Sequence, residues 1–110
     1  MVLKYRQNFV SNSSSTSFII RNDTDEVLII KDFLLENEYL IQEYNDCYSG
    51  DYTLEECLKD NTCNQEIKPG INEMEFGDEY NTPINNIFDY ILRDGGNSER
   101  FTWRFFEFNR

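Results

Sequence analysis

One segment near the C-terminus carries a complete set of helix signals. Its apolar residues recur at the spacing that places them on one face of an α-helix: Ile84, Ile87, Phe88, Ile91 and Leu92. Thr82 is a favoured N-cap residue, Pro83 suits the first helical position, and Gly95-Gly96 ends the pattern. A continuous apolar face must be buried against another element. The sequence therefore predicts a helix here that packs on the rest of the domain.

Three other segments have the residue patterns of β-strands: Ser17–Arg21, Ile71–Phe76 and Phe101–Phe108. In the second segment, Met74 and Phe76 alternate with Glu73 and Glu75, which is typical of a strand with one buried face. The third is expected to be a central strand with Trp103 in the core, because Phe106 and Phe108 supply apolar side chains to its other face.

Shorter patterns complete the prediction of secondary structure. Residues 2–10 are expected to form a short or irregular strand, and Val27–Ile30 either pairs with Ser17–Arg21 as a hairpin or opens the next helix. One broad apolar stripe predicts a helix over Asp32–Asp46. Thr53 and Glu56 have the spacing of a capping box, which predicts a short helix ending near Asp60.

These elements together predict an α+β fold. We expect a small, mostly antiparallel sheet with about three helices packed on one face, forming a single domain over residues 1–110. Aromatic residues make up 15% of the chain, and their large buried areas argue against intrinsic disorder. No apolar run approaches 18 residues and no signal-peptide pattern follows Lys4 and Arg6, so a cytoplasmic location is expected.

The residue types present disfavour several classes of chemistry. The chain has no histidine, which removes the usual general base and every Ser-His or Cys-His nucleophile pair. Cys47, Cys57 and Cys63 are an odd number of cysteines without a fourth zinc ligand, so packing is favoured over disulfides or metal binding. We expect no metal, no cofactor and no enzymatic activity.

Charge is unevenly distributed along the chain. The net charge is −11, and residues 23–99 contain 20 acidic and four basic side chains. Such a body repels nucleic acid directly and attracts a basic protein surface, including one that binds nucleic acid. A solvated acidic edge is the simpler interpretation. The carboxylates expected to contact a partner are Glu36, Glu43, Glu73, Glu75, Asp78 and Glu79.

A polar block near the N-terminus is predicted to be a loop, because serine and asparagine compete for backbone hydrogen bonds. It consists of Ser11, Asn12, Ser13, Ser14, Ser15 and Thr16. Its amides and hydroxyls can bind an anion, although the glycines and lysine of a phosphate loop are missing. A recognition or modification signal and an ordinary hydrogen-bonded loop are the alternatives.

Several segments also resemble a loose group of small, mostly uncharacterised proteins of bacteriophages and bacterial mobile elements. Residues 8–19, with the pattern Phe-Val-Ser-Asn-(Ser)n-Phe-Ile, are similar to the opening of that group, and Thr16 departs from its serine run. Residues 76–79, 88–96 and 101–105 are similar to later segments of the group. The resemblance implies a phage-type origin and supplies no catalytic residues.

Three functions remain open at this point. The first is a non-enzymatic inhibitor that engages a host factor with a basic surface, such as a nucleic-acid-binding defence protein, as an anti-CRISPR protein or nucleic-acid mimic does. The second is a virion or assembly component with the serine-rich segment as a packaging or processing signal. The third is a small nucleotide- or metal-dependent enzyme. The host cytoplasm is the expected location for a phage-encoded protein.

Overall fold

The computed structural model describes residues 15–109 of the chain. These residues form an α+β fold, as predicted, in which four helices accompany two small antiparallel sheets. The elements are β1 (Ser15–Asn22), β2 (Leu28–Ile29), α1 (Ile30–Glu36), α2 (Tyr39–Tyr48), α3 (Leu54–Leu58), η2 (Asn61–Asn64), β3 (Glu66–Ile67), β4 (Gly70–Phe76), η3 (Asp78–Tyr80), α4 (Pro83–Ile91), η4 (Leu92–Asp94), β5 (Gly96–Asn97) and β6 (Phe101–Asn109). No helix in this range combines the length and apolar composition needed to cross a bilayer.

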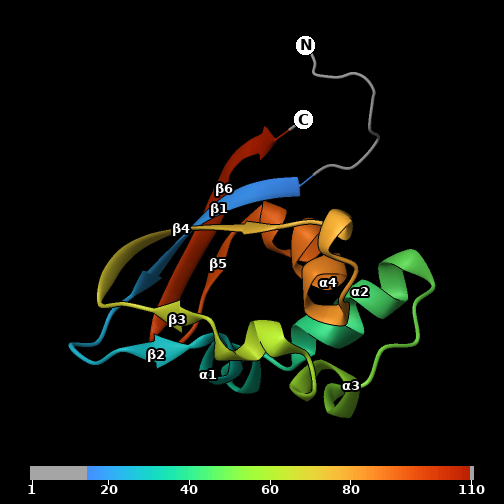
Figure 1. The fold of residues 1–110 in the computed structure, drawn as a ribbon, viewed down its shortest axis with the longest axis horizontal. Helices are drawn as coiled ribbons and strands as arrows, with labels where there is room; N and C mark the ends of the chain where they lie inside the picture. The colour runs from blue at the N-terminus through green and yellow to red at the C-terminus, as the bar shows by residue number, and fades with distance from the viewer. Residues whose placement is uncertain (1–14, 110) are drawn as a thin grey trace.

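The main sheet has the strand order β4-β1-β6-β5, and all its neighbours are antiparallel. Strand β1 is paired along its length on both sides: Phe18 lies opposite Met74 on β4 and opposite Phe105 on β6. Strands β4, β1 and β6 run side by side in Figure 1, with the helices on one side of them. Pairing on both sides makes β1 the strand on which the sheet is built.

Alternation along the strands directs one face of the sheet into the core. Phe18 and Ile20 on β1 are fully buried, as are Phe76 on β4 and Phe101 on β6. On the intervening positions of β4, Glu73 and Glu75 are exposed, as the sequence pattern predicts. Within residues 15–109, the helices therefore cover one face of the sheet, and the other face carries no helical layer.

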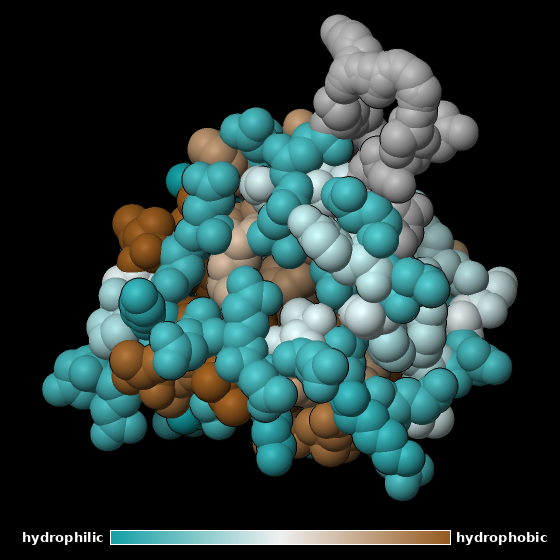
Figure 2. All heavy atoms as spheres, in the orientation of Figure 1, coloured by the Kyte–Doolittle hydropathy of each residue, from teal (hydrophilic) through white to brown (hydrophobic). Residues whose placement is uncertain are grey.

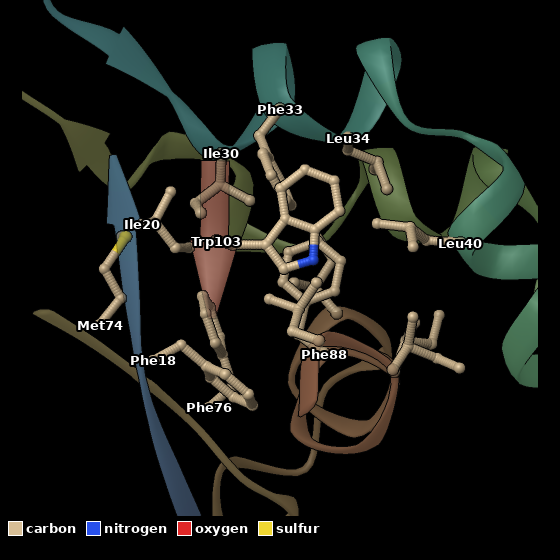
Figure 3. Close-up of a cluster of buried hydrophobic side chains, with 14 of the residues drawn as sticks. Phe18, Ile20, Ile30, Phe33, Leu34, Leu40, Met74, Phe76, Phe88 and Trp103 are labelled. Atoms are coloured by element: carbon tan, nitrogen blue, oxygen red, sulfur yellow. The ribbon is translucent and has the colours of Figure 1, made fainter. Parts of the chain in front are cut away.

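Phe33 of α1 joins the helical layer to the sheet. Its ring makes edge-to-face contacts with Phe88 of α4 at 5.5 Å and with Phe101 and Trp103 of β6 at 5.1 Å between centroids. Such arrangements match the positive edge of one ring to the negative face of another. Trp103 is buried, as predicted, and Figure 3 shows it surrounded by side chains from the sheet and from the helices.

The helix caps follow the sequence signals. The Thr53 Oγ1 accepts a hydrogen bond from the Glu56 backbone N–H at 3.1 Å, and the Glu56 carboxylate accepts one from the Thr53 N–H at 3.1 Å. Thr82 caps α4 by accepting a hydrogen bond from the Asn85 backbone N–H, and Pro83 is the first residue of the helix. Helix α3 nevertheless ends at Leu58, two residues before the predicted end, and Asp60 then caps the 3-10 turn η2.

The predicted helix over 32–46 is two helices. Asn37 ends α1 in a non-helical conformation, with φ −132° and ψ 45°. Its side-chain amide donates hydrogen bonds to the Phe33 carbonyl at 3.0 Å and to the Ser98 hydroxyl at 3.1 Å. The interruption is thus stabilised by a contact with the β5–β6 connection, which lies 61 residues away in sequence.

Of the two alternatives for Val27–Ile30, the hairpin with Ser17–Arg21 was wrong and the start of the next helix is confirmed at Ile30; the predicted extent of the serine-rich loop was also wrong. Leu28 and Ile29 form β2, but they pair with β3 rather than returning on β1 as a hairpin, and Ile30 opens α1. The segment 15–16, predicted as part of the serine-rich loop, belongs to β1. The remainder of that loop, Ser11–Ser14, and the predicted strand over 2–10 lie outside the described residues.

Strand β6 lies between β1 and β5, but its second face is not buried. The register between β1 and β6 shifts between Ser17 and Phe18, so Phe106 has no direct partner on β1. Phe106 is 42% exposed and Phe108 is 46% exposed. The apolar run at the end of β6 therefore does not make this part of the strand a buried central strand.

Replacing Phe33 by alanine is expected to destabilise the fold by about 3–5 kcal/mol, because it leaves a cavity between the layers. Replacing the exposed Phe106 by alanine is the matched control, and its effect should stay within about 0.5 kcal/mol. Urea denaturation followed by tryptophan fluorescence measures both. Equal losses in the two variants would contradict the assignment of Phe33 as the contact between layers.

Candidate protein-binding surface

The described part of the predicted anion loop is engaged with the protein's own carboxylates. Ser15 and Thr16 are both buried on β1. The Ser15 hydroxyl donates a short hydrogen bond to Glu75, and the Thr16 hydroxyl donates one to the buried Asp89 of α4 at 2.6 Å. Because both hydroxyls donate their hydrogen bonds to carboxylate oxygens of the protein, these two side chains do not present donors to an external anion.

Glu75 is the centre of a polar network at one end of the sheet. Besides Ser15, its carboxylate accepts hydrogen bonds from the Asn109 amide at 3.0 Å and from the Tyr80 hydroxyl at 2.9 Å. The hydrogen bond to Glu75, together with burial, raises the pKa of Tyr80 to about 12. Tyr80 therefore remains a neutral donor, and the network joins β4, β1 and β6 with the turn η3.

The six carboxylates expected to contact a partner are distributed over separate parts of the fold. Glu73 and Glu75 lie on the face of the sheet that the helices do not cover, and Asp78 and Glu79 lie in η3 immediately after β4. Glu43 is exposed on α2, in the helical layer. Residues 73–79 are neighbours along β4 and η3, whereas Glu43 lies on a different layer of the fold.

Glu36 connects α1 with the β5–β6 connection. Its carboxylate accepts hydrogen bonds from the Arg100 backbone N–H at 2.8 Å and from the Arg100 Nε at 2.7 Å, and a short one from the Ser98 hydroxyl. Burial alone raises the pKa of Glu36, but the hydrogen bonds from Ser98 and Arg100 and the charge of Arg100 outweigh it, so that the pKa is lowered. Glu36 thus acts within the fold.

Other exposed carboxylates lie on α2 and its N-cap, on α3 and on the segment between the two helices. They belong to Glu38, Glu43, Asp46, Asp51, Glu55 and Glu56, which we call the α2–α3 acidic surface. Among residues 15–109, the ion pairs are Arg21–Asp23, Arg93–Asp89 and Arg100–Glu36, and none includes a member of this surface. The sequence already indicates an acidic surface here, because residues 32–58 include eight acidic and no basic side chains.

Tyrosines lie beside these carboxylates. Tyr44, Tyr48 and Tyr52 form a cluster with Tyr90 of α4, with ring centroids 5.0 to 6.4 Å apart. Burial, followed by the neighbouring tyrosines and Asp89, raises the pKa of Tyr44, which keeps its phenol neutral. Tyr48 is about half exposed, so the cluster presents an aromatic edge to solvent.

A shallow groove of about 320 Å³ separates α2 from the start of α3. The residues that line it are Glu38, Ile41, Gln42, Tyr52, Thr53 and Leu54. It combines apolar side chains with a carboxylate and polar groups. This mixture suits the side chain of a protein partner.

Within residues 15–109, the side chains do not have the grouping of a metal centre. No three of the described Cys, Asp and Glu side chains are grouped as a metal ion would require. Cys57 is buried, and burial followed by the charge of Asp60 raises the pKa of its thiol to about 12. A thiol with such a pKa stays protonated at neutral pH and is a poor nucleophile.

Comparison of the chain with known protein families, curated proteins and solved structures gives no match. The candidate surfaces are therefore argued from the geometry and charge of this chain alone.

The hydrogen bonds and ion pair between Glu36 and Arg100 make the stability of the fold depend on pH. Since the pKa of Glu36 is lowered in the folded state, its contribution is present above the pKa of the unfolded state, near 4.5, and is lost as the pH falls through the folded value. Glu36→Gln is expected to cost about 1–2 kcal/mol at pH 7 and less at pH 3. Urea denaturation at both pH values tests this, with the exposed Glu38→Gln as control. A pH-independent difference would contradict the assignment.

Proposed function

We propose that the protein is a small, non-enzymatic acidic binding protein, encoded by a bacteriophage or mobile element, that engages and inhibits a host protein with a basic surface. The observation that carries the proposal is the α2–α3 acidic surface. It holds six exposed carboxylates that form no ion pair with other described residues. The resemblance of the N-terminal segment to phage proteins supports the proposed origin.

The charge of this surface favours capture of a basic partner. Unpaired carboxylates on one side of a small domain create a negative potential that raises the association rate with a positive surface. The same arrangement repels free nucleic acid, whose phosphates carry the same sign. A protein that normally binds nucleic acid offers a matching positive surface, so binding there competes with its nucleic acid.

The tyrosines supply the second requirement of a stable interface. Charge accelerates encounter, but most binding energy at interfaces comes from a few well-packed residues, among which tyrosine is enriched. Tyr39 and Tyr48 are about half exposed on α2, beside Glu38, Glu43 and Asp46. Their rings can cover the aliphatic part of a lysine or stack on an arginine of the partner.

The acidic surface is tested by reversing two of its charges. Glu43→Lys with Asp46→Lys is expected to weaken binding to the host partner about tenfold or more, which corresponds to about 1.4 kcal/mol. The partner is first identified by affinity purification from bacteria that express the full chain, and affinity is then measured by titration calorimetry. Asp25→Lys with Glu26→Lys is the matched control, because these exposed residues lie in the turn between β1 and β2.

The mode of inhibition is tested with salt and with nucleic acid. Affinity is expected to fall as salt rises from 50 to about 300 mM, since exposed charges are screened. Added DNA or RNA is expected to compete if the partner is a nucleic-acid-binding protein. Salt-insensitive binding, or an equal effect of both double reversals, would remove the α2–α3 acidic surface from the interface.

A further inference from the structure

Strand β4 is an edge strand of the main sheet, and no other described strand pairs with its outer side. It pairs with β1 through residues 71–76, and within residues 15–109 no strand pairs with its other side. Such an edge presents unpaired backbone N–H and C=O groups that can form a ladder with an added strand. In the strand order β4-β1-β6-β5, β4 therefore stands at one end of the sheet. The edge is seven residues long, enough for a short added strand.

A cleft of about 400 Å³ runs beside this edge. On the strand side it is lined by Glu73, Met74 and Glu75. Consecutive residues of a strand point to opposite faces, so a cleft that touches all three lies along the edge rather than on either face. The opposite wall is formed by Thr62, Gln65, Tyr80, Thr82 and Asn85. The space is therefore bounded by a strand edge and by a polar wall.

The charge around the cleft selects its occupant. The side chain of Glu73 is exposed and makes no hydrogen bond or ion pair with another described residue. Glu79 is exposed in the adjoining turn η3. Figure 2 shows hydrophilic side chains over most of this side of the molecule, with the hydrophobic atoms in separate groups. A cationic strand is complementary to these carboxylates.

A second copy of the chain is a poor occupant for the same reason. Two β4 edges that pair antiparallel about residues 73–75 place the glutamates of one copy opposite those of the other. Like charges directly opposite one another on adjacent strands are destabilising. The exposed glutamates therefore disfavour self-association through this edge and leave it open to a chain of opposite charge.

We propose that β4 binds an extended basic peptide of a partner protein as an added strand, with the peptide backbone along the β4 edge and a cationic side chain beside Glu73. Residues of the peptide that alternate with the cationic ones face the cleft next to Met74, where Thr62, Thr82 and Asn85 supply polar contacts. The preferred sequence thus alternates lysine or arginine with small or β-branched residues. This surface is separate from the α2–α3 acidic surface, so it does not depend on the function proposed above.

The test uses a labelled heptapeptide, Thr-Lys-Val-Lys-Val-Lys-Thr, with the full-length protein. Binding is measured by fluorescence anisotropy, and amide hydrogen exchange reports protection along β4. Two further peptides carry N-methyl groups either on the lysines or on the valines, so that each removes backbone N–H groups pointing to one side only. If the peptide binds as an added strand, one N-methylated peptide binds at least tenfold more weakly than the unmodified peptide, and the other binds less than twofold more weakly. Equal behaviour of the two peptides overturns the proposal, because electrostatic attraction alone does not distinguish them.

Variants of the protein locate the site. Glu73→Lys is expected to weaken peptide binding at least tenfold, whereas Glu43→Lys, which makes the same change of charge on α2, should change it less than twofold. Equal losses in both variants, or none in Glu73→Lys, overturn the proposal. Loss of host-partner binding in the Glu43→Lys and Asp46→Lys protein, with peptide binding intact, separates this site from the α2–α3 acidic surface.

Two other occupants are distinguished in the same assay. Lys4→Glu with Arg6→Glu in the full chain removes positive charges near its N-terminus. A tenfold gain in peptide affinity from this change assigns the edge to the chain's own first residues and overturns the proposal. Analytical ultracentrifugation tests for a second copy of the chain. A dimer that dissociates when the peptide is added identifies that copy as the occupant and also overturns the proposal. An unchanged peptide affinity in the Lys4→Glu, Arg6→Glu protein, together with a monomer in analytical ultracentrifugation, supports the proposal.

Discussion

The contacts of Phe33 with Phe88, Phe101 and Trp103 are the interaction on which the layered structure depends. One ring from α1 meets α4 and β6, so the helical layer and the sheet share a single aromatic core. Phe88 extends this core to β4 through its contact with Phe76 at 5.1 Å. Because the edge-to-face geometry restricts how the rings can meet, these contacts determine where the helices lie on the sheet.

This arrangement determines which surfaces remain for partners. The helices use their apolar faces on one side of the sheet, so the outward faces of α2 and α3 carry carboxylates and tyrosines. Within residues 15–109, the other face of the sheet has no helical cover, and a cleft remains between the β4 edge and a wall that includes Thr82 and Asn85 at the start of α4. The two proposed surfaces therefore lie on different layers, and a partner can engage either one without occluding the core contacts.

Local sequence signals predicted the elements whose determinants are near in sequence. Thr53 with Glu56 and Thr82 with Pro83 mark helix starts in the structure because each cap involves residues within three positions of one another. The alternation around Met74 predicted a half-buried strand for the same reason. These patterns act through backbone geometry that needs no distant partner.

The predictions of local structure were wrong where a contact with a residue distant in sequence determines the conformation. Asn37 ends α1 partly because Ser98 accepts a hydrogen bond from it, and Ser15 and Thr16 continue β1 because Glu75 and Asp89 accept hydrogen bonds from their hydroxyls. The serine pattern by itself favours a loop. No property of the local sequence reports those partners.

The candidate site shows the same division. The amino-acid sequence determined the net charge of −11, the absence of histidine and the excess of carboxylates between residues 32 and 58, since these are properties of composition. Only the tertiary structure decided that Glu36 is held by Arg100 within the fold and that Glu43 lies on a different layer from Glu73. The physical reason is that a carboxylate is available to a partner only if the folded chain brings no donor to it, and donors arrive from anywhere in the sequence.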